Sequence, residues 1–171
     1  DSKLDEKSKI APSSLYGINK SSSFWLAKYY REHFNSFVST GIMFNHESRL
    51  RADSYITKKI IIQAKEIIKK KREFFEVYNS NQLVDWGHAE DYVIAMHAIM
   101  QLSYADDFVI SSGSLHSIKD FIKIVCKKLD ISYNDDIIKS MTNKKTDYFY
   151  GDNSKIIKAT KWKPSATLEK I

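Results

Sequence analysis

The order of apolar and polar positions predicts helices and strands that alternate along the chain. Ser13 or Ser14 can cap a first helix that runs to about His33. Residues 36–43 then form a short β-rich run, which ends at the polar segment 45–48. The first part of the chain is therefore predicted to be a helix followed by a strand.

The same alternation continues through the rest of the chain. A second predicted helix opens at Asp53 or Ser54 and runs to about Arg72, and its buried side holds Ile60, Ala64, Ile67 and Ile68. Residues 73–78 are a second predicted strand. Residues 88–101 are predicted to form a core helix, with one face made of Tyr92, Ala95, Met96 and Ile99. A strand over 107–111, a helix over 117–129 that Ser117 caps, and a short strand over 148–150 before a final helical stretch complete the prediction. This alternation favours the α/β fold class.

Composition agrees with one soluble globular domain that has a core of its own. Of the 171 residues, 43% are hydrophobic and 28% are charged. No apolar run reaches the length of about eighteen residues that a membrane span needs. The net charge of +6 makes nucleic acid a candidate partner. However, the lysines are mixed with acids as on an ordinary solvated surface, and no basic-aromatic module is visible, so nucleic-acid binding is the weakest interpretation.

Cysteine, histidine and glycine positions argue against several kinds of site. The single cysteine, Cys126, lies among apolar residues at helical spacing, which indicates a buried core thiol in a cytosolic protein. No two of the five histidines lie four residues apart, so no metal site is predicted. The five glycines lie too far apart for a Gly-x-Gly-x-x-Gly or Walker loop. The start at Asp1, without Met or a leader, is interpreted as an internal start, so we expect a cytoplasmic protein cut from a longer one.

Tyr16 and Lys20 are the first candidates for chemistry. Their spacing of four places both side chains on one helix face, one turn apart. A phenol has a reference pKa near ~10, and a neighbouring ammonium favours the phenolate by roughly 1–3 units. This arrangement can take a proton from a sugar or alcohol hydroxyl. A Tyr-x-x-x-Lys pair on a helix is common, so its meaning depends on the surrounding motifs.

Several such motifs follow in order. They are Tyr-Gly-Ile-Asn-Lys from Tyr16, Asn-His-Glu-Ser from Asn45, Asp-Trp-Gly-His-Ala from Asp85, and Gly-Asp-Asn-Ser-Lys from Gly151. Together they resemble the C-terminal half of the extended short-chain dehydrogenases/reductases, and most closely the GDP-mannose 4,6-dehydratases. The resemblance covers nearly the whole chain.

The resemblance implies a fold and a division of the chain. The fold would be the C-terminal half of an NAD(P)-binding Rossmann-like fold plus the smaller substrate-binding domain. Residues 1–44 would be the remainder of the dinucleotide-binding domain. Residues 45–171 would mainly bind the nucleotide sugar, with 84–112 returning to the Rossmann sheet.

The resemblance also implies a lyase activity that depends on NADP, with NAD as the alternative. Tyr16 would deprotonate the C4 hydroxyl of the sugar, and Lys20 would hold the nicotinamide ribose and lower the pKa of Tyr16. Loss of water and return of the hydride would give a 4-keto-6-deoxy sugar. The family's Ser/Thr and Glu catalytic partners lie upstream of the tyrosine, so activity would need a missing N-terminal half. Glu6 matches a loop position instead.

Binding roles are carried over in the same way. Besides Tyr16 and Lys20, the expected cofactor contacts are Asn45, His46 and Arg51. The expected substrate contacts are Asn45, Ile56 and Lys59. Arg51 matches one of two paired arginines that reach the cofactor of a neighbouring subunit, so a homo-oligomer, dimer or tetramer, is expected.

The chain also departs from the family pattern. Val84 and Thr142 stand where arginines are expected, and Leu50 replaces the first of the paired arginines. Lysine cannot reproduce a bidentate arginine fork, although Lys144 and Lys145 could compensate as point charges. Two alternatives therefore stay open: another nucleotide-sugar epimerase or dehydratase of the superfamily, and a catalytically inactive interaction fragment.

Overall fold

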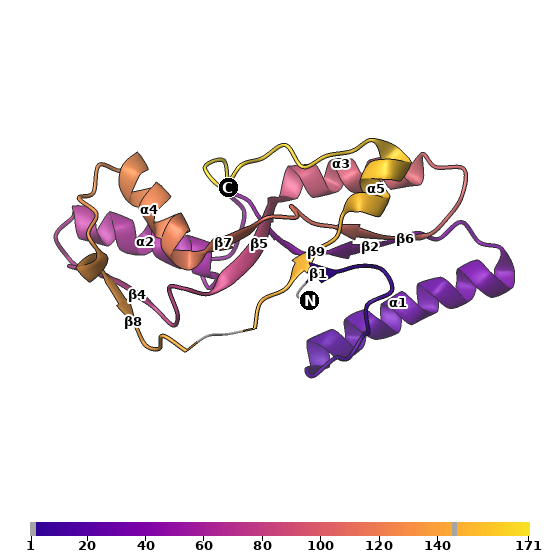
Figure 1. Cartoon of the computed structure of the whole chain (residues 1–171), viewed down its shortest axis with the longest axis horizontal. Helices are drawn as coiled ribbons and strands as arrows, with labels where there is room; N and C mark the ends of the chain where they lie inside the picture. The colour runs from indigo at the N-terminus through magenta and orange to yellow at the C-terminus, as the bar shows by residue number, and fades with distance from the viewer. Residues whose placement is uncertain (1–2, 145–146) are drawn as a thin grey trace.

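A computed structural model describes residues 3–144 and 147–171. The elements follow in the order β1 (Lys3–Leu4), α1 (Leu15–Phe34), β2 (Thr40–Met43), β3 (Asn45–Glu47), α2 (Ile56–Ile68), β4 (Phe75–Val77), β5 (Leu83–His88), α3 (Ala89–Met100), β6 (Asp107–Ile110), β7 (Leu115–Ser117), α4 (Ile118–Lys128), the 3-10 helix η1 (Asp135–Ile137), β8 (Ile138–Ser140), β9 (Tyr150–Gly151) and α5 (Ser154–Thr160). Figure 1 shows this mixture of helices and short strands. The α/β prediction is confirmed.

Most strand pairs are parallel, as crossover connections through helices require. β2 pairs with β6, with Thr40 opposite Asp107 and Met43 opposite Ile110. β5 is the centre of a three-stranded sheet, parallel to β3 and antiparallel to β7. The pairs β4–β8 and β1–β9 are also parallel. The β1–β9 pair joins the two ends of the described chain.

Buried apolar side chains form two separate cores. The first lies between α2, α4, β4 and β5 and includes Ile60, Phe75, Trp86, Phe121, Ile122 and Cys126. The second lies between α3, α5 and β6 and includes Tyr92, Ala95, Phe108, Ile156 and Trp162. Figure 1 shows α2 and α4 at one end of the molecule, and α3 with α5 over the β2–β6 pair.

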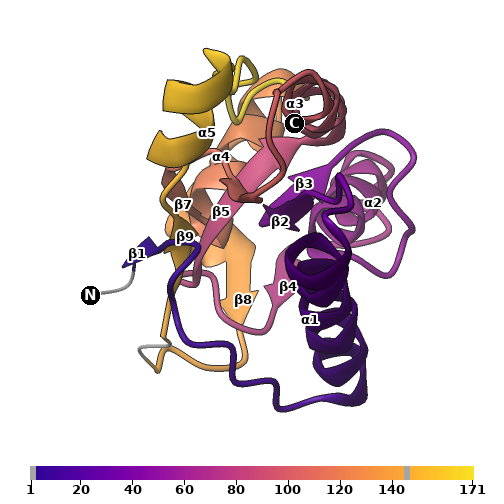
Figure 2. The ribbon, with the colours of Figure 1, turned by 90° about the vertical axis from the view of Figure 1, so that its right-hand side faces the viewer.

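Helix α1 stands outside both cores, because none of its residues is buried. It lies on the opposite side of the β2–β6 pair from α3 (Figure 2). Its large apolar side chains are exposed to solvent in this chain: Leu15, Ile18, Trp25, Leu26, Tyr29, Tyr30 and Phe34. Such a continuous apolar surface is typical of a protein interface.

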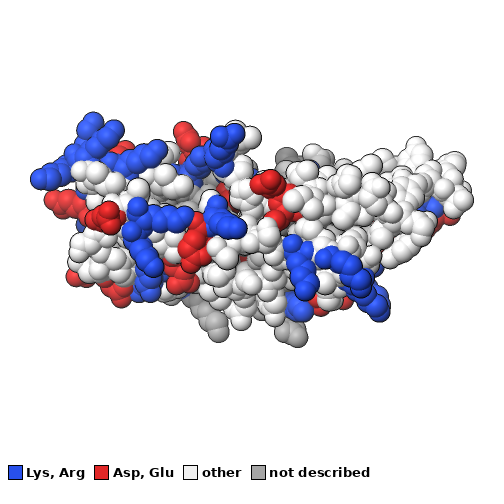
Figure 3. Space-filling model, turned by 90° about the horizontal axis from the view of Figure 1, so that it is seen from above, with Lys and Arg blue, Asp and Glu red and all other residues white. Residues whose placement is uncertain are grey.

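Surface charge is unevenly spread along the long axis of the molecule. In Figure 3, Lys and Arg are interspersed with acidic side chains over the end that carries α2 and α4. The opposite end, where α1 and the connection from α3 to β6 lie, shows few charges in that view. Mixed charges are typical of a solvated surface, whereas a face with few charges resembles a surface that another protein covers.

Two side-chain caps that the sequence predicts at helix N-termini are confirmed. Ser14 caps α1 by accepting a hydrogen bond of 3.1 Å from the backbone N–H of Gly17. Ser117 caps α4 in a reciprocal capping box with Asp120. Cys126 is fully buried, as its apolar surroundings predicted.

Other details of the prediction are wrong. The second helix begins at Ile56 and ends at Ile68, because Lys70 turns the chain with a positive φ of 56°. Its last residue, Ile68, and Met96 on α3 are exposed, since each helix packs through a narrower stripe than expected. The first strand begins only at Thr40, and the polar segment that follows it contains β3. The sequence analysis also missed the strands β1, β5, β7 and β8.

Candidate active site

The direction of the strands defines the edge of the β2–β6 pair where a site is expected. In open sheets of parallel strands, ligands bind outside the carboxyl ends of the strands. Figure 1 shows α1 running in the opposite direction to β2. The N-terminal turns of α1 therefore lie toward the carboxyl ends of β2 and β6, together with the segments that follow both strands.

Tyr16 and Lys20 occupy those N-terminal turns and are brought together as predicted. The Nζ atom of Lys20 lies 5.5 Å from the centroid of the Tyr16 ring. Tyr16 is 72% exposed, so its hydroxyl is open to a substrate. An accessible phenol beside an ammonium can exchange a proton with a bound hydroxyl, which is general acid–base chemistry.

The loop before α1 supports this turn of the helix. A Cβ atom added at Gly17 would lie 3.2 Å from the Cβ of Pro12 and 3.3 Å from the Oγ of Ser14. Glycine at this position therefore lets residues 12–14 lie close against the helix that carries Tyr16.

Asn45 and His46 follow β2 at the same edge of the sheet. The Asn45 side chain is exposed, while its backbone carbonyl accepts a hydrogen bond of 3.4 Å from the Tyr92 hydroxyl. The Nδ1 atom of His46 lies 3.0 Å from the carbonyl oxygen of Phe44. Because a carbonyl only accepts, Nδ1 is the donor in this contact, which fixes the orientation of the ring. Burial, followed by the charges of Asp85 and Asp91, raises the pKa of Tyr92, so this phenol stays neutral.

Arg51 is held by its own neighbours. Its Nε atom lies 3.3 Å from Oε2 of the buried Glu47, which also accepts a hydrogen bond of 2.8 Å from the Thr57 hydroxyl. The guanidinium carbon lies 3.5 Å from the centroid of the Tyr55 ring. This stacked, paired position orders the loop between β3 and α2.

The two remaining predicted contacts, Ile56 and Lys59, lie on α2. Ile56 is half-buried and packs against the first core, and Lys59 is exposed. Within residues 3–144 and 147–171, no hydrogen bond or ion pair joins Tyr16 or Lys20 to the other predicted site residues, Asn45, His46, Arg51, Ile56 and Lys59.

Asp85 is a residue of this region that sequence reasoning quoted only as part of a motif. Its buried carboxylate accepts hydrogen bonds from the backbone N–H groups of Ser112, Gly113 and Gly151 and from the Ser112 hydroxyl. It thereby ties β5 to the turn after β6 and to β9. The sequence signal for this role was an acidic residue within the apolar run of β5. A buried carboxylate in such a run needs several hydrogen-bond donors.

Comparison with known proteins identifies the family. The family model for GDP-mannose 4,6 dehydratase matches residues 1–171. The chain belongs to the GDP-mannose 4,6-dehydratase family. A Drosophila melanogaster GDP-mannose 4,6 dehydratase is 32% identical over 187 residues, which cover 98% of this chain and 47% of that protein. The human protein of the same name is 31% identical over 186 residues, covering 97% of this chain and 50% of the relative. The chain thus spans about half the length of these curated relatives.

Solved structures share the fold of this dehydratase-family chain. RMD from Pseudomonas aeruginosa, complexed with NADPH, superposes with a TM-score of 0.86 at 18% identity, over 96% of this chain and 56% of that one. The dTDP-glucose 4,6-dehydratase of Bacillus anthracis, in complex with NAD, superposes with a TM-score of 0.82 at 15% identity, over 98% of this chain and 52% of that one. At these identities the likeness concerns the fold alone.

Val84 and Thr142 occupy the positions for which the family resemblance implies arginines. Val84 is half-buried on β5 and packs against the first core. The backbone N–H of Thr142 donates to the carbonyl of Tyr78 at 3.0 Å, and the carbonyl of Lys144 accepts a hydrogen bond from Asn79. Lys145 lies outside the described residues. The compensating role expected of the two lysines stays a prediction.

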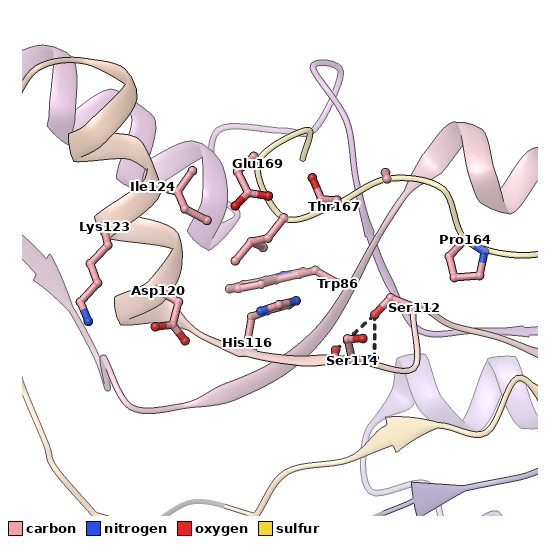
Figure 4. A pocket seen from close by; sticks show the side chains of 12 residues that line it. Trp86, Ser112, Ser114, His116, Asp120, Lys123, Ile124, Pro164, Thr167 and Glu169 are labelled. Atoms are coloured by element: carbon pink, nitrogen blue, oxygen red, sulfur yellow. Dashed lines mark hydrogen bonds between the residues drawn. The ribbon is translucent and has the colours of Figure 1, made fainter.

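A pocket of about 500 Å³ lies elsewhere on this dehydratase-family chain, between α4, the β5–β7 pair and the segment 164–169. Figure 4 shows Trp86 and His116 next to each other in it, with Asp120 and Lys123 on α4 at its edge. None of the seven predicted site residues lines this pocket. It is therefore separate from the Tyr16 region.

Two further properties concern the described residues as a whole. Across residues 3–144 and 147–171, no group of three or more His, Cys, Asp or Glu side chains is arranged to hold a metal ion. Every helix in that part of the chain is too short or too polar to cross a bilayer.

Proposed function

We propose that this chain supplies the substrate-binding half and the tyrosine–lysine pair of an NADP-dependent nucleotide-sugar 4,6-dehydratase, a lyase, with GDP-mannose as its substrate. One observation carries the proposal. In a chain of this family, Tyr16 and Lys20 lie together and open to solvent in the first turns of α1. These turns lie at the edge of a parallel sheet where ligands bind.

The proposed roles follow from where the side chains lie. The Tyr16 phenolate takes the proton of the sugar's C4 hydroxyl as the hydride leaves C4. Because C4 stays a ketone in the product, that proton passes to the departing water or to C5, which restores the phenolate. The Lys20 ammonium donates hydrogen bonds to ribose hydroxyls of the cofactor. Asn45, His46, Ile56, Lys59 and Arg51 keep the binding roles that the family resemblance implies.

The residues present fit one end of NADP. The exposed pair Tyr16 and Lys20 suits the nicotinamide ribose, whereas the widely separated glycines offer no cradle for the pyrophosphate. When bound, NADP accepts a hydride from the sugar and gives it back, and water is lost in between. The cofactors named for the similar folds, NADPH and NAD, support this choice.

The proposal includes a dinucleotide-binding half and a homo-oligomer. Within the described residues, β2 pairs only with β6, and a two-stranded parallel sheet is not stable by itself. A further strand beside β2 would complete it. The exposed apolar side chains of α1 support contact with other subunits in a dimer or tetramer. The buried free Cys126 supports a reducing compartment, the cytoplasm.

The nucleotide is the part of the proposal for which two candidates stand. Val84 packs against the first core and has no donor for a diphosphate, unlike an arginine. This favours a second candidate function: the same chemistry on another nucleotide sugar. Calorimetric titration of GDP, CDP and UDP into the intact enzyme separates the two. Tight GDP binding that is insensitive to salt supports GDP-mannose; preference for CDP or UDP supports the second candidate.

The activity itself is tested with the dinucleotide-binding half present. We expect GDP-mannose and catalytic NADP to give a product that is lighter by one water, detected by mass spectrometry. Absence of turnover with GDP-, CDP- and UDP-sugars, in an assembly that binds NADP, would favour the inactive interaction fragment instead.

A further inference from the structure

Helix α1 carries the proposed catalytic pair but has little that holds it to the rest of the chain. Its half-buried residues form one stripe along the helix, which includes Gly17, Ser21, Phe24, Lys28 and Arg31. In the described part of the chain, Arg31 is the one α1 side chain that makes hydrogen bonds to residues outside the helix. The position of α1 therefore depends strongly on Arg31.

The contacts of Arg31 fix its direction as well as its distance. Its Nη1 and Nη2 atoms donate to Oδ1 and Oδ2 of Asp107 at 3.0 and 2.7 Å, and Nη1 also donates to the Val38 carbonyl at 2.9 Å. The side chains of the pair are only 15% and 11% exposed. A two-pronged arginine–carboxylate contact restricts rotation, which a single point charge does not.

Asp107 is itself a fixed anchor. It is the first residue of β6 and pairs with Thr40 at the start of β2. Its backbone N–H donates to Asp106, and its carbonyl accepts a hydrogen bond of 2.8 Å from Lys155 on α5. The Arg31 fork thus joins α1 to the sheet at a point that β2 and α5 both hold.

Helix geometry carries this restraint to the other end of α1. Lys20 and Arg31 lie about three turns apart and only about 20° apart around the helix axis. Tyr16 is about 60° from Arg31 around the axis and about 22 Å along it. A fork that prevents rotation and sliding at Arg31 therefore sets the direction in which Tyr16 and Lys20 face.

We propose that Arg31, paired with Asp107, is a positioning residue that aims Tyr16 and Lys20 at the substrate; this inference rests on the proposed function. Misplacement of a catalytic group by about 1 Å can cost on the order of 10²-fold in rate. The expected substrate contacts Asn45 and Lys59 lie on other elements, so loss of the fork reduces turnover and leaves substrate affinity nearly unchanged.

The test compares Arg31→Gln, Arg31→Lys and Asp107→Asn in the intact enzyme, with the dinucleotide-binding half present. We expect Arg31→Gln to lower kcat by about 10–100-fold while KM for the nucleotide sugar changes less than about 3-fold. Arg31→Lys keeps the charge but not the two-pronged contact, so we expect a smaller loss of kcat than in Arg31→Gln. This variant also tests the proposal if Arg31→Gln destabilises the fold. The double variant Arg31→Gln/Asp107→Asn loses no more kcat than the worse single variant, because both changes remove the same interaction.

Lys28→Gln is the matched control. Lys28 lies on the same stripe, and this change removes only contacts inside α1: the pairing with Glu32 at 3.8 Å and the contact of its Nζ with the Trp25 ring at 5.4 Å. Hydrogen exchange of the α1 amides is expected to become faster in Arg31→Gln and to stay unchanged in Lys28→Gln. Unchanged kcat in Arg31→Gln beside an inactive Tyr16→Phe overturns this inference alone. Full activity of Tyr16→Phe overturns the proposed function.

Discussion

The phenol of Tyr16 is the group on which the proposed chemistry depends. Because this side chain is 72% exposed, Tyr16→Phe removes the hydroxyl with little effect on packing. We expect turnover to fall by ~10²–10⁴-fold while the affinity for NADP stays within about threefold, since the hydroxyl is needed for proton transfer and Lys20 still holds the ribose. Steady-state kinetics and fluorescence titration of NADPH measure the two effects. Tyr30→Phe, on the same helix, is the control, and equal activity of Tyr16→Phe and wild type would contradict the role.

Cys126 offers a second test at the scale of one residue. It is fully buried in the first core, and burial raises the pKa of its thiol. We expect no reaction with Ellman's reagent in the native protein at neutral pH and stoichiometric reaction in guanidinium, because the thiolate is the reactive form. Rapid labelling of the folded chain would show that this core opens.

Single residues were predictable where their partners are close in sequence. The spacing of Tyr16 and Lys20 predicts one helix face, and the structure shows the two side chains in contact range. Asp85 was not assigned a role, because its hydrogen-bond donors come from residues 112, 113 and 151. No local pattern records such distant partners. The contact of Arg51 with Glu47 likewise depends on the course of a loop.

At the scale of elements, Asp91 on α3 holds the segment that follows α5. Its carboxylate accepts hydrogen bonds from the hydroxyl and N–H of Ser165 and from the N–H of Ala166. Burial alone would raise the pKa of Asp91, but these hydrogen bonds and the charge of His88 outweigh it and lower the pKa.

This clamp makes stability depend on pH. A carboxyl whose pKa is lower in the folded protein contributes stability above its unfolded pKa of about 3.9, and this contribution is lost as pH falls through the folded value. We expect Asp91→Asn to reduce the free energy of unfolding at pH 7 and to flatten its decline below about pH 4. Chemical denaturation between pH 3 and 7 measures this. Asp53→Asn, at an exposed position, is the control, and parallel pH profiles for wild type and Asp91→Asn would refute the clamp.

Elements were predictable in proportion to their length and their caps. α1 and α4 were found because Ser14 and Ser117 mark their starts, and several turns display the helical period. β7 and β8 contain three residues each, too few to show alternation, and they exist because partner strands supply their hydrogen bonds. The same reason explains why β3 was read as a polar segment.

At the scale of the whole molecule, the chain exposes surfaces that a complete fold would cover. The free edge of β2 and the apolar side chains of α1 both favour association. We expect the 171-residue chain, expressed alone, to be poorly soluble or to form assemblies, and coexpression with a dinucleotide-binding half to give one defined species. Size-exclusion chromatography with light scattering measures the mass. A monodisperse monomer with a sharp two-state melt would argue against this expectation.

The pairing of β1 with β9 also dictates the order in which the chain can fold during its own synthesis. Lys3 pairs with Tyr150 and Leu4 with Gly151, so β1 is synthesised long before its partner strand. Glu6, in the turn after β1, accepts a hydrogen bond from the backbone of Val109, which is also made late. At the usual rate of about 5–20 residues per second, these N-terminal residues wait on the order of ten seconds or more for their partners. β1 is thus added to a fold that the residues between β1 and β9 have already begun to build.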